Sequence, residues 1–215
     1  MKSLNITLVT EGTSDVALIP HIRWLLRQNG IENPIEAIWA DLRHLPRSFE
    51  IKGLSKKISL ALDLYPCDFL FIHRDSDNTS VEEREAEILT AIENIEGNKP
   101  NHFVCVVPVK ETEAWLLFNE EAMRRAAGNP NGNEPLNLPK LKDIENLTDP
   151  KQFLNEKLKI ASGKKGRRLA KFNVAHSVIL ISEYIEDFSP LRNLPAFNKL
   201  ETKIKEIISK INFGS

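Results

Sequence analysis

Short apolar runs alternate with amphipathic stretches over the first half of the chain. Four runs have the length and the Leu, Ile, Val and Phe content of buried strands: 4–9, 34–40, 68–73 and 102–109. Three intervening stretches repeat apolar residues at helical spacing: 16–28, 54–65 and 81–95. This alternation predicts an α/β fold, a mainly parallel central sheet with helices on both faces.

Local signals refine two of the expected helices. Pro20 lies inside the first, where we expect it to bend the helix axis. The third is preceded by Thr79 and Ser80, and Glu82 and Glu83 follow three residues later. This spacing predicts a capping box at the start of that helix.

The second half of the chain changes character. A loop rich in Asn, Pro and Gly covers 128–138, and only helical patterns follow it: 150–160, 168–187 and 196–211. We therefore expect an α/β core over residues 1–127 and a helical extension over 128–215 that packs on this core as one compact unit.

Composition narrows the class of protein. The chain has 215 residues, of which 41% are apolar and 27% charged, which is typical of a folded domain and excludes collagen-like or fully disordered chains. No apolar run is long enough to span a bilayer, and the N-terminal run is too short for a secretory signal. Cys67 and Cys105 lack CxxC spacing, so we expect a reducing, cytoplasmic setting with no disulfide and no zinc site.

Charge is segregated although the net charge is only −1. Residues 82–96 hold six acidic side chains and one basic one, whereas 157–171 hold seven basic side chains and no acidic one. Four of the basic residues flank a glycine between a predicted loop and a helix: Lys164, Lys165, Arg167 and Arg168. They are candidates for binding phosphate or nucleic acid, although a solvated helix end explains them equally well. The segment lacks the Walker A pattern, which argues against a triphosphate loop.

Carboxylates follow all four predicted strands. They are Glu11 after the first, Asp41 after the second, Asp75 and Asp77 after the third, and Glu111 and Glu113 after the fourth. The carboxyl ends of parallel strands meet at one edge of a sheet, so these side chains should crowd together there. Crowded carboxylates repel one another unless a cation neutralises them, and oxygen ligands suit Mg²⁺ or Mn²⁺. The pattern predicts a metal site, and turn or helix-start chemistry is the simpler alternative.

Other reactive residue types give weaker signals. His21 and His73 fall on predicted buried elements, where a core histidine is the simpler interpretation than a ligand. Trp115 stands beside two leucines and is expected in the core rather than in a base-stacking platform. Neither cysteine has a partner arrangement for catalysis, and no GxSxG nucleophile motif occurs.

Two of these segments resemble a known family. The sequence around Glu11-Gly12 and the Asp75-Ser76-Asp77 segment resemble the strand-end Glu and the Asp-x-Asp of the Toprim domain, which occurs in topoisomerases, primases and OLD-family nucleases. The chain is more similar to a small stand-alone Toprim-like family of bacterial proteins, DUF4276. Segment 108–117 resembles the Glu-x-x-Ala-Trp-Leu-Leu stretch of this family, and 194–197 resembles its C-terminal motif.

The resemblance implies roles for the strand-end residues. Asp75 and Asp77 would bind Mg²⁺, and Glu11 would act as general acid/base or as a further ligand. Glu113, with Glu111, would complete a second metal site as in OLD-type nucleases, where two ions activate water and stabilise the leaving oxygen. Lys110 would neutralise developing phosphate charge.

The chain also departs from the family pattern. Asp15 follows the Glu-Gly-Thr-Ser segment where many members have Glu directly after Thr, and Arg74 precedes the Asp pair, where it could pair with Asp75. An ion pair between Arg74 and Asp75 would lower the need of Asp75 for a metal ion.

The sequence is compatible with three functions. The first is a Mg²⁺-dependent phosphodiesterase or nuclease acting on DNA or RNA, in bacterial defence beside a partner ATPase as the resemblance implies. The alternative is a non-catalytic Toprim-like module that binds a polyphosphate or nucleic-acid ligand or docks on such an ATPase. The third, small-molecule phosphotransfer, is disfavoured because no Gly-rich phosphate loop occurs. Oligomeric state is left open.

Overall fold

The computed structural model describes residues 2–46, 51–77 and 79–210 of the chain. Four strands form one all-parallel sheet: β1 (Leu4–Val9), β2 (Ile35–Trp39), β3 (Phe69–His73) and β4 (Phe103–Val106). Their order is β2-β1-β3-β4, which places β1 and β3 at the centre. Leu8 pairs with Phe71, and Phe71 pairs with Val104, so the carboxyl ends of these strands are aligned. The predicted α/β fold with a parallel sheet is confirmed.

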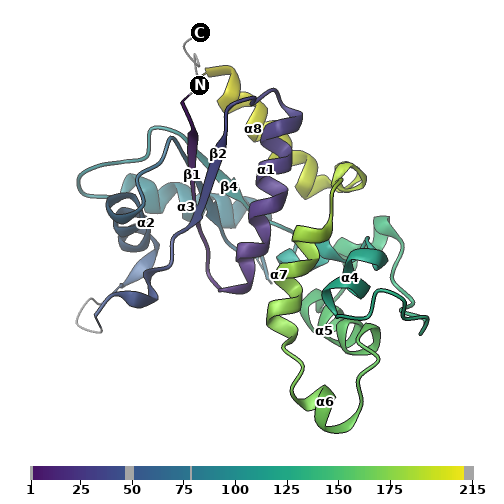
Figure 1. Ribbon diagram of the computed structural model, residues 1–215. Coiled ribbons are helices and arrows are strands. Elements are labelled where there is room, and N and C mark those ends of the chain that lie inside the picture. The colour runs from purple at the N-terminus through teal and green to yellow at the C-terminus, as the bar shows by residue number, and fades with distance from the viewer. Residues whose placement is uncertain (1, 47–50, 78, 211–215) are drawn as a thin grey trace.

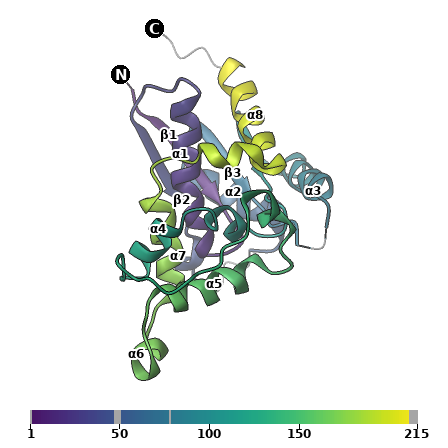
Figure 2. The same cartoon turned by 90° about the vertical axis from the view of Figure 1, so that its right-hand side faces the viewer.

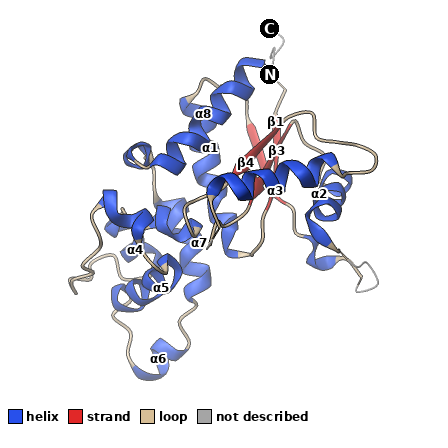
Figure 3. Cartoon of the chain, turned by 180° about the vertical axis from the view of Figure 1, so that it is seen from behind, coloured by secondary structure: helices blue, strands red, loops and turns tan. Residues whose placement is uncertain are grey.

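Helices cover both faces of the sheet. Helices α1 (Leu18–Gln28) and α8 (Pro195–Lys210) lie on one face, and α2 (Gly53–Leu64) and α3 (Val81–Glu93) lie on the other (Figures 1 and 3). Each face has its own buried cluster because alternate strand residues point in opposite directions. Leu8 and Phe71 belong to the α1 side, and Leu70 and Ile72 to the α2 side.

Two of the local sequence signals have a clear structural outcome. Residues Ser14–Ala17 form a separate 3₁₀ turn, so α1 begins only at Leu18. Pro20 therefore lies in the first helical turn, where its missing N–H removes no helical hydrogen bond. The predicted capping box is confirmed, with the Ser80 side chain accepting from the Glu83 N–H and Glu83 bonding back to Ser80.

The C-terminal portion is helical, as predicted. It contains α5 (Pro150–Ala161), α6 (Gly166–Ala170) and α7 (Val174–Tyr184), preceded by α4 (Glu120–Ala126). The expectation of one helix over 168–187 is wrong. Asn173 interrupts it, because its side chain accepts the His176 N–H and caps a new helix. Ile211, expected to end the last helix, lies outside the described residues.

The α/β core and the helical portion share one buried cluster. Trp115 is fully buried, and its ring meets the Phe197 ring edge-on, with centroids 5.3 Å apart. Segments 108–117 and 194–197 thus meet in the core, where Trp115 has the packing role expected of it. Figure 2 shows the helical portion lying beside and below the sheet. Within the described ranges no helix has the length and apolarity needed to cross a membrane. Both cysteines are free thiols.

His21 makes this core sensitive to acid. The side chain is fully buried, and its Nδ1 lies 2.9 Å from the Ala17 carbonyl oxygen. The centre of its ring lies 4.2 Å from that of Phe188, with the two planes tilted by 40°. Burial lowers the pKa of His21 from 6.5 to about 4. The unfolded chain therefore binds one more proton than the folded chain between these pH values, and stability falls as the pH drops through this window.

We expect His21→Phe to flatten this acid dependence. The lowered pKa of His21 should cost wild type roughly 3 kcal/mol of unfolding free energy between pH 6.5 and pH 4. Urea denaturation at both pH values measures the loss, which should be smaller in the variant whatever its absolute stability. An identical pH slope in both proteins would contradict this role of His21.

Candidate functional site

The loops after β3 and β4 are bonded to each other at the carboxyl edge of the sheet. The Lys110 N–H donates to Ser76 Oγ at 2.7 Å, and the Asp77 N–H donates to the Lys110 carbonyl at 3.3 Å. The Thr112 N–H donates to Asp75 Oδ1 at 3.2 Å. These bonds bring the acidic segments of two neighbouring strands together, as the strand order requires.

Two residues of these loops have left-handed backbone conformations. Asp77 has a φ of 51° and Lys110 a φ of 62°. This region is costly for residues other than glycine, although Asp tolerates it better than most. Such strain tends to concentrate at functional sites, and here the mutual hydrogen bonds of the two loops hold it in place.

His73, the last residue of β3, is buried between two carboxylates. Its Nδ1 lies 3.3 Å from Asp15 Oδ2, and its Nε2 lies 3.1 Å from Asp75 Oδ1 and 2.9 Å from Thr112 Oγ1. Burial acts to lower the pKa of His73, but the two carboxylates outweigh it and raise the pKa to about 9. His73 is therefore a cation at neutral pH and fixes the position of Asp75.

Glu11 and Asp77 stand at the two ends of a chain of alternating charges. Arg74 lies 2.7 Å from Glu11 and 3.0 Å from Glu87, measured from Nε and Nη1 to carboxylate oxygens. Arg84 lies 2.8 Å from Glu87 and 3.6 Å from Asp77. Arg74 thus pairs with Glu11, not with Asp75 as the sequence suggested. We expected a metal ion to neutralise Glu11 and Asp77. In the structure, the guanidinium groups of Arg74 and Arg84 face these two carboxylates instead.

Glu111 and Glu113 converge on the start of α5. The Lys151 N–H donates to Glu111 Oε2 at 2.9 Å, and the Lys151 ammonium lies 3.8 Å from Glu113 Oε1. Glu113 is only 3% exposed. Burial raises the pKa of Glu113 to about 7, Lys151 opposes this shift, and the charges of Asp75 and Glu111 add to it. Asp75, Glu111 and Glu113 are therefore close enough to repel one another.

A small polar cavity lies between these groups. It has a volume of about 150 Å³ and is lined by Asp77, Lys110, Glu111, Thr148 and Asp149. Lys110 lines it, and the Lys110 ammonium donates to the Thr148 carbonyl oxygen at 3.4 Å. Lys110 is thus placed beside the acidic edge, where a phosphate-neutralising cation was expected.

Asp41 does not join the other carboxylates. Its side chain pairs with Arg43 through two contacts of 2.7 and 2.6 Å, and it caps the turn that follows β2. The Arg43 guanidinium holds the pKa of Asp41 well below its usual range. Asp41 therefore has a structural role in the turn after β2 and is not part of the acidic cluster.

The fit to a divalent metal is partial. Asp75, Glu111 and Glu113 offer hard carboxylate oxygens, one of them buried, and their mutual repulsion would be relieved by a cation. In the described part of the chain, however, no three His, Cys, Asp or Glu side chains are arranged to hold a metal ion. Carboxylate oxygens of this kind suit Mg²⁺ or Mn²⁺. In this structure, the Lys151 ammonium provides the positive charge that faces Glu113.

The basic segment lies far from this edge. Helix α6 forms the tip of the helical portion in all three views (Figures 1, 2 and 3). The Lys164 ammonium donates to the Ala127 carbonyl at 2.9 Å and lies 4.7 Å from the centre of the Phe172 ring, whereas Lys165, Arg167 and Arg168 are exposed. The structure does not bring this segment to the acidic edge, because the separate helix α6 carries it outward. We withdraw it as a phosphate-binding element of this site.

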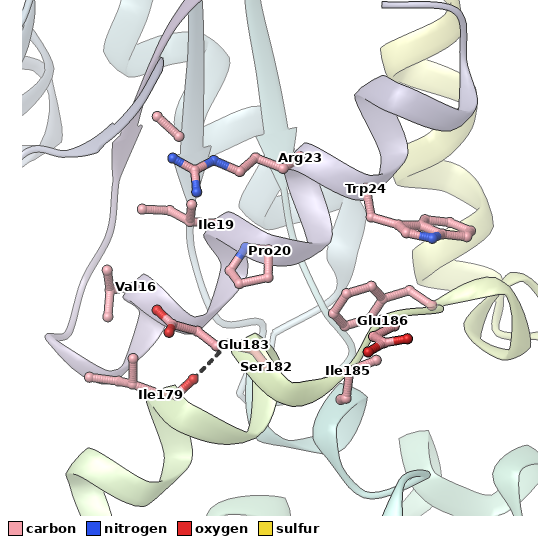
Figure 4. A pocket seen from close by; sticks show the side chains of 12 residues that line it. Val16, Ile19, Pro20, Arg23, Trp24, Ile179, Ser182, Glu183, Ile185 and Glu186 are labelled. Atoms are coloured by element: carbon pink, nitrogen blue, oxygen red, sulfur yellow. Dashed lines mark hydrogen bonds between the residues drawn. The ribbon is translucent and has the colours of Figure 1, made fainter. Parts of the chain in front are cut away.

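A further groove lies between α1 and α7, away from the acidic residues. Figure 4 shows its lining, in which Ile19 and Trp24 of α1 face Ile179 and Ile185, with Arg23 at its border. Its volume is about 560 Å³, and it contains none of the predicted site residues. Size alone therefore does not identify a functional site in this molecule.

Sequence reasoning missed three residues of the site. Asp15 was considered only as a departure from the family pattern, and His73 only as a core residue, yet the two interact through a buried ion pair. A histidine that ends an otherwise apolar strand two residues before Asp-x-Asp was the available signal for His73. Lys151 gave no signal, because it is 38 residues from Glu113 in the sequence and becomes its neighbour only through the fold.

Comparison of the chain with protein-family models, with curated proteins and with solved structures found no match.

Proposed function

We propose that this protein is a divalent-cation-dependent phosphodiesterase that acts on nucleic acid, with its active site at the carboxyl edge of the sheet. One observation carries the proposal: Glu113 is buried at this edge, where the charges of Asp75 and Glu111 act on it and raise its pKa further. Burial of such a group is costly without a counter-charge, and the only ion-pair partner of Glu113 in the described residues is the exposed Lys151.

To hold Mg²⁺ or Mn²⁺, the side chains of Asp75, Glu111 and Glu113 would have to turn toward one ion, since they are not arranged around one in the described part of the chain. Asp77 lines the small cavity beside Glu111. The bound ion would supply Lewis-acid activation of the phosphodiester and of a water molecule. The chain itself would orient and neutralise the groups involved. His73 keeps Asp75 in place through its 3.1 Å contact, and Lys110 offers a cation to the phosphate oxygens.

Glu11 is the candidate for proton transfer. In hydrolysis, a water oxygen forms a bond to phosphorus while the bond to the leaving oxygen breaks, and one proton must move from the water to the leaving group. Arg74 orients the Glu11 carboxylate through its 2.7 Å contact. Glu11 would accept the proton from water, in agreement with the role that the Toprim resemblance implies.

A second candidate function is a non-catalytic Toprim-like module that binds a polyphosphate or nucleic-acid ligand, or docks on a partner ATPase. It is favoured by the ion pairs that Glu11, Asp75, Asp77 and Glu113 already form with cationic side chains. A module of this kind needs no metal, because the carboxylates would serve to position arginine and lysine side chains. The free thiols are consistent with a reducing, cytoplasmic setting for either function.

Cleavage of end-labelled DNA and RNA, single- and double-stranded, separates the two candidates. We expect cleavage with Mg²⁺ or Mn²⁺ and none with EDTA. Cleavage that persists in EDTA would refute the enzyme as proposed. Binding of nucleic acid with no cleavage under any of these metal conditions would favour the non-catalytic module.

A further inference from the structure

A second cavity borders Glu11 on the side of the sheet that α2 covers. Its volume is about 520 Å³, within the range of roughly 300–1,000 Å³ that small-molecule sites occupy. Glu11 and Arg74 line it, so it adjoins the acidic edge. The other lining residues are Thr10, Leu42, Arg43, Ile51, Gly53, Leu54, Lys57 and His73.

The polar part of this lining is mainly cationic. Lys57 is half-buried, and its ammonium donates to the Thr10 carbonyl at 2.5 Å. Within the described ranges, no carboxylate lies at ion-pair distance from Lys57, whereas Arg74 is paired with Glu11 and Glu87. Arg43 is paired with Asp41 and is 62% exposed.

Lys57 and Arg74 are close enough to repel each other. Burial lowers the pKa of Lys57, and the Arg74 guanidinium acts in the same direction, whereas the charges of Glu11 and Asp15 oppose the shift, Glu11 more strongly than Arg74 promotes it. Glu11 and Asp15 act on Lys57 from beyond ion-pair distance, and its direct partner is a carbonyl group, which supplies only a dipole. An anion that contacts both Lys57 and Arg74 would stabilise the two like charges at the wall of the cavity.

The remaining walls are apolar and suit the body of a nucleotide. Leu42, Ile51 and Leu54 line the cavity together with the cations. A ligand that combines a compact anion with a flat, weakly polar body matches this lining, since apolar surface accepts a base and cationic groups accept a phosphate.

We propose that this cavity binds the phosphate monoester of a nucleotide, with Lys57 and Arg74 contacting the phosphate and the apolar wall contacting the sugar and base. The ligand is a free mononucleotide or the terminal nucleotide of a 5′-phosphorylated strand, which share this chemistry. The choice of a nucleotide rests on the proposed function. The binding itself needs no divalent cation.

The test uses the full chain in EDTA at low salt, so that a failure of metal-dependent cleavage does not affect the outcome. Affinity is measured by calorimetry for three probes: adenosine monophosphate, a 5′-phosphorylated oligonucleotide and the same oligonucleotide with a 5′-hydroxyl. We expect a phosphate-bearing probe to bind and the 5′-hydroxyl form to bind at least about tenfold more weakly. Binding of the mononucleotide alone identifies a free ligand, and binding of the phosphorylated strand identifies a nucleic-acid end.

Lys56 provides a matched control on the same helix. It is exposed and does not line the cavity, whereas Lys57 does. Lys57→Gln should weaken binding of the phosphate-bearing probe about tenfold, Lys57→Arg should retain most of it, and Lys56→Gln should leave it unchanged. Equal losses in the Lys56 and Lys57 variants, equal affinity for the 5′-phosphate and 5′-hydroxyl strands, or no binding of any probe would overturn the proposal.

Discussion

Asp75→Asn is expected to reduce metal-dependent cleavage of nucleic acid at least about a hundredfold. The asparagine keeps the size of the side chain and can still accept the Thr112 N–H, so the loop should retain its shape. It removes the charge that faces His73 and that would bind the divalent cation. Steady-state cleavage rates at saturating Mg²⁺ measure the effect.

Asp41→Asn is the matched control for this change. Asp41 also follows a strand of the sheet, but its carboxylate is paired with Arg43 and caps the turn after β2. Its substitution should leave cleavage within about twofold of wild type, since it touches no proposed ligand. Wild-type cleavage by the Asp75 variant, or equal losses in both variants, would show that Asp75 has no special role.

Glu113→Gln is expected to stabilise the metal-free protein at pH 8. The pKa of Glu113 is raised from 4.5 to about 7, so the folded state holds a proton that the unfolded state releases between these values. Stability is therefore lost as the pH rises from 4.5 to 7, and the full penalty persists above pH 7. The neutral amide removes this penalty, which amounts to about 3 kcal/mol.

Urea denaturation in EDTA at pH 8 and pH 4.5 tests whether Glu113 lowers stability as the pH rises. The stabilisation by Glu113→Gln should be large at pH 8 and close to zero at pH 4.5, where wild-type Glu113 is already protonated in the fold. Glu121→Gln, at an exposed position of α4, is the control and should have little effect at either pH. Destabilisation by Glu113→Gln at pH 8 would mean that the ionised carboxylate is well compensated and has no need of a cation.

Much of the architecture was predictable because the apolar pattern is strong. The runs that became β1 and β3 are buried on both faces, and the stretches between strands repeat apolar residues with the period of a helix. The pattern failed at Asn173, since a polar cap that interrupts a helix leaves the apolar spacing on either side almost unchanged. It also left open where α6 points, because that depends on packing between distant segments.

The position of the candidate site was predictable from the sequence, but the ion pairs that its carboxylates form were not. Parallel strands place Asp75 and Glu113 at one edge, which follows from strand order alone. Which cation faces which carboxylate depends on residues far apart in the sequence, such as Lys151 beside Glu113. The sequence therefore predicted that a metal ion neutralises these carboxylates. In the fold, arginine, histidine and lysine side chains face several of them.

Direct titration of the metal-free protein with Mn²⁺, followed by the electron paramagnetic resonance signal of the free ion, tests the central claim. The account predicts that wild type binds at least one Mn²⁺ per chain, that Asp41→Asn retains this binding, and that Asp75→Asn and Glu113→Gln each lose most of it. Absence of binding by wild type, or binding that survives in both the Asp75 and the Glu113 variants, would contradict a cation site at the carboxyl edge of the sheet.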